Sequence, residues 1–107
     1  MTDRDGSFYL EPDVYLFTKF TLVRGEMVAF IAQLEIYRDG RWYSIVRYDT
    51  VHGEAHIDYL DPGGKEYDKV WLGVRAPYNK LYAAITAALR AEYQKHIVRW
   101  ERQRGRR

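Results

Sequence analysis

The 107-residue sequence contains no cysteine, and this absence excludes three kinds of chemistry. Without thiols the chain has no disulfide bond, no thiolate metal site and no cysteine nucleophile. It also has no apolar run near the roughly 20 residues that a membrane-spanning helix needs. Its first residues, MTDRDGSF, lack the pattern of a secretory signal peptide. Together these absences predict a soluble, cytoplasmic protein that does not bind a membrane.

Motifs of several common enzyme classes are absent as well. The sequence has no glycine-rich phosphate loop, no G-x-S-x-G nucleophile elbow and no H-E-x-x-H zinc motif. Phosphoryl transfer from nucleotides and hydrolysis by a serine triad are therefore poor hypotheses. No cofactor is predicted.

Aromatic residues are abundant, and arginine is concentrated near the C-terminus. Ten Tyr, four Phe and three Trp suit the core of a sheet, or a surface that stacks on bases or on a partner protein. The net charge is +2, but residues 90–107 hold seven Lys or Arg and two Glu, which is +5. This basic end predicts an anionic partner, RNA or another polyanion. The residues assigned to this binding are Arg99, Arg102, Arg104, Arg106 and Arg107.

Alternating apolar residues and turn signals predict an α+β fold. Five strands bounded by turn sequences are expected, at residues 15–23, 27–37, 41–51, 55–60 and 66–74. After Pro77, apolar residues recur every three or four positions, which predicts a helix from Tyr78 to about Arg102. The expected architecture is a four- to five-stranded antiparallel β-meander with one long C-terminal helix packed on one face. The expected organisation is a flexible N-terminal arm at 1–14, a single domain at 15–102 and a basic tail at 103–107.

The predicted helix is long for so small a domain. Roughly 25 residues rising about 1.5 Å each span about 40 Å, whereas a 100-residue domain has a radius of gyration of about 13 Å. The helix beyond Tyr93 is therefore expected to extend past its own sheet. Ile97 and Trp100 would then lie in the contact of a homodimer.

The turn at Arg38-Asp39-Gly40 decides which residues of its two strands share a face. A two-residue turn would pair Tyr37 with Trp42 and would mix polar and apolar side chains on one face. A three-residue loop with a bulge at Gly40 separates them, and the sequence favours it for this reason. The predicted core face, covered by Leu81, Ile85 and Leu89, then comprises Val28, Phe30, Ala32, Leu34, Ile36, Trp42, Ser44, Val46, Tyr48 and Thr50.

Residues 47–58 read RYDTVHGEAHID, which places two of the three histidines and two aspartates beside an arginine. Aspartates on neighbouring strands repel each other unless a cation lies nearby. Arg47, a protonated His56 or a metal ion could be that cation. If a two- or four-residue loop joins the third and fourth expected strands, six side chains share the face away from the core. These are Glu35, Tyr43, Arg47, Asp49, His56 and Asp58.

Four interpretations of this group stay open. In the first, Arg47 pairs with the aspartates and the group has a structural role. In the second, Asp49, His56 and Asp58 bind Mn²⁺, Mg²⁺ or Zn²⁺, although no recognised metal spacing is matched. The third is metal-independent RNA cleavage, with His56 in proton transfer and Arg47 on the phosphate charge. The fourth is binding without chemistry. For cleavage, the candidate catalytic residues are His56, Arg47, Asp49, Glu35, Tyr43, Asp58 and His52.

The stretch VRYDTVHGEAHIDYLDPGGK follows a strand with A-Q-L-E and a D-G-R-W turn. It resembles a group of small uncharacterised prokaryotic proteins with an R-Y-D-x-x-H-G-x-x-H-x-D motif, a Pro-Gly turn and a C-terminal helix. This resemblance covers most of residues 15–100 and implies a family but not an activity. More faintly, the motif region is similar to the TumE-type ribonuclease toxins of prokaryotic toxin–antitoxin pairs. That similarity implies an RNA substrate and an antitoxin protein as partner.

Two functional hypotheses follow from the sequence. The first is a small intracellular protein that acts on or binds RNA, with a toxin-like endoribonuclease as its enzymatic form. The alternative is a non-catalytic dimeric module that binds nucleic acid or a protein partner. An enzyme should bring Arg47, Asp49 and His56 together in a concave site, whereas a binding module should spread them over a surface.

Overall fold

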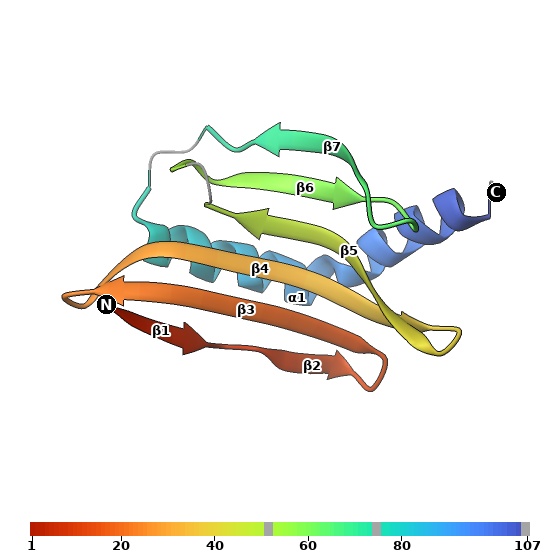
Figure 1. Ribbon diagram of the computed structural model, residues 1–107, viewed down its shortest axis with the longest axis horizontal. Coiled ribbons are helices and arrows are strands. Elements are labelled where there is room, and N and C mark those ends of the chain that lie inside the picture. The colour runs from red at the N-terminus through yellow and green to blue at the C-terminus, as the bar shows by residue number, and fades with distance from the viewer. Residues whose placement is uncertain (51–52, 74–75, 106–107) are drawn as a thin grey trace.

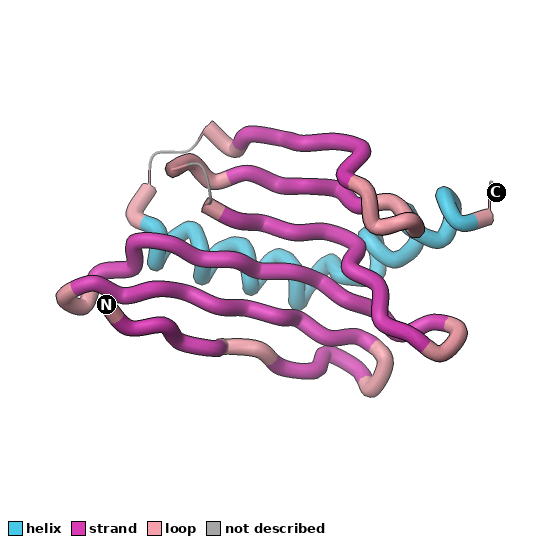
Figure 2. Tube along the Cα trace, in the orientation of Figure 1, coloured by secondary structure: helices cyan, strands magenta, loops and turns pink. Residues whose placement is uncertain are grey.

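The computed structural model describes residues 1–50, 53–73 and 76–105, with one antiparallel sheet and one long helix against it (Figures 1 and 2). The strand order is β1-β3-β4-β5-β6-β7, and β2 also pairs with β3. The predicted α+β class is confirmed, and the sheet has seven strands rather than four or five. The elements are β1 (Thr2–Asp5), β2 (Phe8–Glu11), β3 (Val14–Val23), β4 (Glu26–Arg38), β5 (Arg41–Asp49), β6 (His56–Leu60), β7 (Glu66–Trp71) and α1 (Tyr78–Arg104).

The N-terminal residues are part of the sheet. The sequence predicts a flexible arm at 1–14, but β1 and β2 pair with β3, with Phe8 opposite Leu16. Between the two strands, the N–H of Gly6 donates to the carbonyl of Thr18 at 3.1 Å. β3 would otherwise present ten residues of unpaired backbone at the edge of the sheet, and β1 and β2 satisfy these groups. The two strands are short and mostly exposed, so they carry little of the apolar pattern that identifies strands.

The turn between β4 and β5 has two residues, so the predicted three-residue loop is wrong. Arg38 pairs with Arg41, and Tyr37 pairs with Trp42. Both residues of the Asp39-Gly40 turn have positive φ angles, 52° and 86°. A two-residue turn of this kind matches the twist of the strands that flank it, and glycine or aspartate accepts the backbone conformation readily.

A bulge in β5 then returns the side chains of the rest of the strand to the faces that were predicted for them. Glu35 lies opposite Ser44, but the next residue, Leu34, lies opposite Val46, which leaves Ile45 as an extra residue. One extra residue reverses the alternation of side chains. From Val46 onward the side chains lie on the predicted faces, with Val46 and Tyr48 toward the core and Arg47 and Asp49 away from it. The residues before the bulge lie on faces opposite to those predicted.

Most of the predicted core is buried, with four exceptions. Val28 is exposed because it is an extra residue in a bulge of the β3–β4 pairing. Trp42 is exposed and Ser44 is on the other face because both precede the bulge in β5. Tyr48 is half-buried. The predicted core residues that the structure buries are Phe30, Ala32, Leu34, Ile36, Val46, Thr50, Leu81, Ile85 and Leu89.

α1 begins at Tyr78, directly after Pro77, as the sequence predicts. It runs across β4 and β5 on one face of the sheet (Figure 1). Trp100 is fully buried, with its ring 5.0 Å from that of Tyr43, so its predicted place in a homodimer contact is wrong. The 13 residues of β4 span roughly 43 Å, which matches the roughly 40 Å of the 27-residue helix. Within the described residues, no helix is long and apolar enough to cross a membrane.

Candidate functional site

Four of the candidate catalytic residues lie together on the face of the sheet that α1 does not cover. Arg47 is opposite Asp58, and Asp49 is opposite His56, across β5 and β6. The strands are joined by six residues rather than two or four, so the pairing differs from the predicted Asp49–Asp58 opposition. Six is also an even number, and the four side chains therefore share a face as predicted.

His56 lies between the two carboxylates. Its Nε2 atom is 2.9 Å from Oδ1 of Asp49 and 3.4 Å from Oδ2 of Asp58. Its Nδ1 atom is 3.2 Å from the carbonyl oxygen of Glu54. Both ring nitrogens thus face acceptors, and a protonated ring would donate a hydrogen bond on each side. These contacts fix the orientation of the ring.

Two cationic side chains also contact the aspartates. Arg47 reaches Asp49 with Nε at 3.4 Å and Asp58 with Nη2 at 3.3 Å. Lys69 of β7, directly opposite Asp58, places Nζ 3.2 Å from its Oδ1 atom. Burial raises the pKa of Asp58, but the contacts with Lys69, His56 and Arg47 outweigh burial and hold that pKa below its ordinary value. Asp58 is therefore a charged carboxylate at neutral pH.

Sequence reasoning missed Lys69. The only signal for it is the register of β7 against β6, and a single sequence does not fix that register. We call Arg47, Asp49, His56, Asp58 and Lys69 the charged cluster.

The charged cluster is largely inaccessible to solvent. His56, Asp58 and Asp49 are 1%, 2% and 5% exposed, and the ring of Trp71 packs 5.0 Å from that of His56. A general acid or base must come within hydrogen-bond reach of its substrate. The residues converge, as an enzyme requires, but their burial weighs against proton transfer from His56 to an RNA.

The same residues form a group that could hold a metal ion. One ligand atom each from Asp49, His56 and Asp58 lies within 4.8 Å of the others. Arg47 and Lys69 already contact these carboxylates, so two positive side chains face two negative ones without an ion. Buried carboxylates that are paired with positive side chains in this way need no further cation. This arrangement favours a structural ion-pair network.

The other candidate catalytic residues do not join the charged cluster. Glu35 lies on the same face but accepts a hydrogen bond from Gln33 at 3.0 Å, nearer to the hairpin turn. Tyr43 packs against Trp100 on the helix side, because it precedes the bulge in β5. His52 lies outside the described residues.

The arginines predicted to bind polyanions differ in their surroundings. Arg99 donates a hydrogen bond to a β5 carbonyl at 2.9 Å and lies 4.4 Å from the ring of Tyr59. Arg104 forms an ion pair with Asp39 at the hairpin turn. Arg102 is exposed, and residues 106 and 107 lie outside the described part of the chain. Arg99 and Arg104 thus contribute to the fold itself.

An aromatic cluster on the helix-free face was not identified from the sequence. It consists of Tyr9, Tyr15, Tyr37 and Trp42, whose ring centroids lie 4.7 to 6.3 Å apart in the observed contacts. Tyr9, Tyr37 and Trp42 are 41% to 63% exposed. The signal for it was the two-residue turn, which sets Tyr37 beside Trp42 on the face away from the core. Exposed apolar patches of this kind are typical of interaction surfaces.

The C-terminal part of α1 lies at the same end of the molecule as the aromatic cluster. Arg38, at the end of β4, pairs with Glu101 of α1 at 3.1 Å. The pair between Arg104 and Asp39 makes a second link at the turn. Figure 1 shows this end of the helix and the β4–β5 hairpin turn at one end of the long axis. Basic residues and exposed aromatic rings, far apart in sequence, are thus brought into one region.

Comparison with known proteins identifies a family. No curated protein and no solved structure is significantly similar to the chain. A family described as a domain of unknown function (DUF7718) matches residues 1–106. This match assigns no activity, and the similarity to ribonuclease toxins stays a prediction. The chain belongs to the DUF7718 family.

Proposed function

We propose that this protein binds single-stranded nucleic acid, RNA above all, on the helix-free face of its sheet. The observation that carries the proposal is the exposed aromatic cluster of Tyr9, Tyr15, Tyr37 and Trp42. Proteins that bind single strands stack bases on exposed aromatic rings, and each stacked base contributes about 1–3 kcal/mol. An antiparallel sheet with its helix on the opposite face leaves such rings free for bases.

Positive charge at the same end of the molecule as the aromatic cluster supports the same function. Arg41 follows the hairpin turn and is exposed, with its guanidinium over the ring of Tyr43, and Arg102 is exposed on the helix end that the hairpin contacts. Single-strand binding combines stacking with cationic side chains along the phosphate backbone. Stacking requires bases that are not already paired in a duplex. The aromatic cluster therefore favours single strands over double strands.

Binding is favoured over cleavage because of the burial of the charged cluster. His56 and its carboxylate neighbours are enclosed, and the ring contacts both carboxylates. Ion pairs of this kind contribute to the structure of the sheet without contact to a ligand. We therefore assign the charged cluster a structural role and the aromatic cluster the binding role.

The anisotropy of a fluorescein-labelled 12-nucleotide RNA, titrated with protein, tests the proposal. Trp42→Ala and Tyr37→Ala should each raise the Kd about 5- to 150-fold, which corresponds to the loss of one stacked base. The matched control is Val98→Ala on α1, which removes a similarly exposed apolar side chain outside the aromatic cluster. The control should leave the Kd unchanged. No binding by the wild type, or equal losses in all three variants, would refute the proposal.

Incubation of the same RNA with pure protein separates binding from cleavage. The RNA should remain intact on a denaturing gel, with and without Mg²⁺ or Mn²⁺. Cleavage by the wild type that disappears in a folded His56→Ala variant would instead support the ribonuclease hypothesis.

A further inference from the structure

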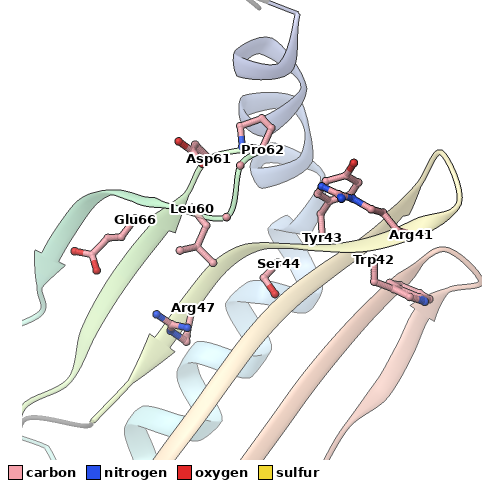
Figure 3. A pocket seen from close by; sticks show the side chains of 11 residues that line it. Arg41, Trp42, Tyr43, Ser44, Arg47, Leu60, Asp61, Pro62 and Glu66 are labelled. Atoms are coloured by element: carbon pink, nitrogen blue, oxygen red, sulfur yellow. The ribbon is translucent and has the colours of Figure 1, made fainter.

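A pocket of about 340 Å³ lies next to the aromatic cluster (Figure 3). One wall comes from the first half of β5, from Arg41 to Arg47, and the other from the β6–β7 connection, from Leu60 to Glu66. Trp42 belongs to both the aromatic cluster and the lining of the pocket. A strand stacked on Trp42 would therefore reach the pocket without leaving the surface.

Arg41 is the cationic group of this pocket that is best placed for a ligand. Its guanidinium carbon lies 4.4 Å from the ring centroid of Tyr43. Within the described part of the chain, no carboxylate lies within 4.0 Å of Arg41. A guanidinium that stacks on a ring keeps the N–H groups at its edge available, and these match the geometry of a phosphate.

A second donor lies on the same wall. The hydroxyl oxygen of Ser44 accepts a hydrogen bond from Gln33 at 2.9 Å, which leaves the hydroxyl proton for a ligand. Arg47 also lines the pocket, but its guanidinium is held by Asp49 and Asp58. Arg47 therefore adds positive potential rather than a free hydrogen-bonding group.

Two carboxylates line the pocket, and both have other contacts. Asp61 accepts a hydrogen bond from the backbone N–H of Lys65 at 2.9 Å, and Glu66 lies 3.8 Å from Lys69. Figure 3 shows both carboxylates directed away from the side where Arg41 lies. The wall of the pocket that β5 forms is therefore its positive side.

We propose that this pocket binds a backbone phosphate of a single strand, with Arg41 as its charged donor and Ser44 as a second donor. The inference rests on the proposed function for the identity of the strand. Arg41 stacks on Tyr43, on the helix side of β5, but Trp42 lines the same pocket, so the phosphate site would adjoin the aromatic cluster at the edge of this strand. The pocket would thus add a phosphate contact next to the aromatic cluster.

The salt dependence of RNA binding tests the role of Arg41. On single strands, each phosphate contact contributes about 0.7 to the slope of log affinity against log salt. Arg41→Gln should reduce the slope by about this amount and should remain folded, because Arg41 is exposed and makes no ion pair in the described structure. Lys95→Gln is the matched control, because Lys95 is an exposed cation of α1 outside the pocket. Equal slopes for wild type and Arg41→Gln would overturn the inference and leave the proposed function standing.

Inorganic phosphate provides a probe that does not depend on RNA. In a ¹H–¹⁵N NMR titration with phosphate, the amide signals of Ser44 and Gly63 should shift in the wild type and not in Arg41→Gln. Phosphate shifts at the pocket without any RNA binding would support an anion site and refute the proposed function. RNA binding without phosphate shifts and with an unchanged slope in Arg41→Gln would refute the phosphate pocket alone.

Discussion

Replacement of Asp58 by Asn should destabilise the protein, because this carboxylate is the centre of the charged cluster. It is almost fully buried, and the three cationic or ring nitrogen atoms of Lys69, Arg47 and His56 lie 3.2 to 3.4 Å from its oxygens. Asn keeps the shape of the side chain. It removes the negative charge and replaces one acceptor by an NH₂ group that faces these donors.

The expected loss is about 3 kcal/mol in the free energy of unfolding, within the roughly 3–5 kcal/mol that a broken buried ion pair costs. The lower part of that range applies because the Arg47 and Lys69 side chains are 33% and 28% exposed. Each can turn toward water when its partner is lost. A loss of this size is a large fraction of the roughly 5–15 kcal/mol by which domains are stable.

The effect should depend on pH in a defined direction. The pKa of Asp58 is lowered in the folded protein, so its charge contributes stability above the unfolded-state pKa of about 3.9. That contribution is lost as the pH falls through the folded-state pKa. The difference between wild type and Asp58→Asn should therefore be fully present at about pH 5.5 and smaller at about pH 3.

Urea denaturation followed by circular dichroism at both pH values measures this difference. Asp68→Asn is the matched control, because Asp68 is exposed on the neighbouring strand and the same substitution there should change stability by less than about 0.5 kcal/mol. A change below about 0.5 kcal/mol for Asp58→Asn at pH 5.5 would refute the assignment of the charged cluster as a stabilising network. A difference that does not shrink in acid would show that the charge is not its source.

Two further predictions concern the packing of the edge strands and the state of the third histidine. Gly6→Ala should lower the free energy of unfolding, measured by urea denaturation, by about 1–3 kcal/mol. The reason is that the new Cβ atom would lie 2.7 Å from Oγ1 of the buried Thr18. Gly105→Ala is the control, because the nearest atom to a Cβ there is 3.5 Å away. His96 should titrate in ¹H–¹³C NMR with a midpoint of about 4, because burial and then the charge of Arg99 lower its pKa. The unfolded chain then binds more protons below about pH 6.5, so stability should fall as the pH is lowered toward 4. An unperturbed midpoint would show that the ring is hydrated.

The class of the fold and the grouping of the charged cluster were predictable from the sequence because both depend on local patterns. Pro77 and the three- and four-residue spacing of apolar residues define where α1 begins and which side it buries. Side chains alternate between the two faces along a strand. Arg47 and Asp49 therefore share a face of β5, and His56 and Asp58 share a face of β6. The two pairs meet on one face for any even loop length, so an error of two residues left the group intact.

The sequence could not predict on which face of the sheet Tyr43, Trp42 and Ser44 lie, because one bulge residue decides it. Ile45 is accommodated in β5 by packing against segments that are distant in the chain. A local pattern cannot say whether the extra residue lies in the turn or within the strand. The sequence argument chose the turn, and the aromatic cluster was missed for that reason.

Burial and the choice of partners were decided only by the tertiary structure. Lys69 reaches Asp58 because β7 pairs with β6, and Trp71 covers His56 because it lies opposite that residue in the same pairing. Trp100 is buried because β4 is as long as the helix that crosses it. Alternation along one strand is set by backbone geometry within a few residues. Which side chains cover or neutralise one another depends on the register between strands, and that register is fixed by packing over the whole sheet.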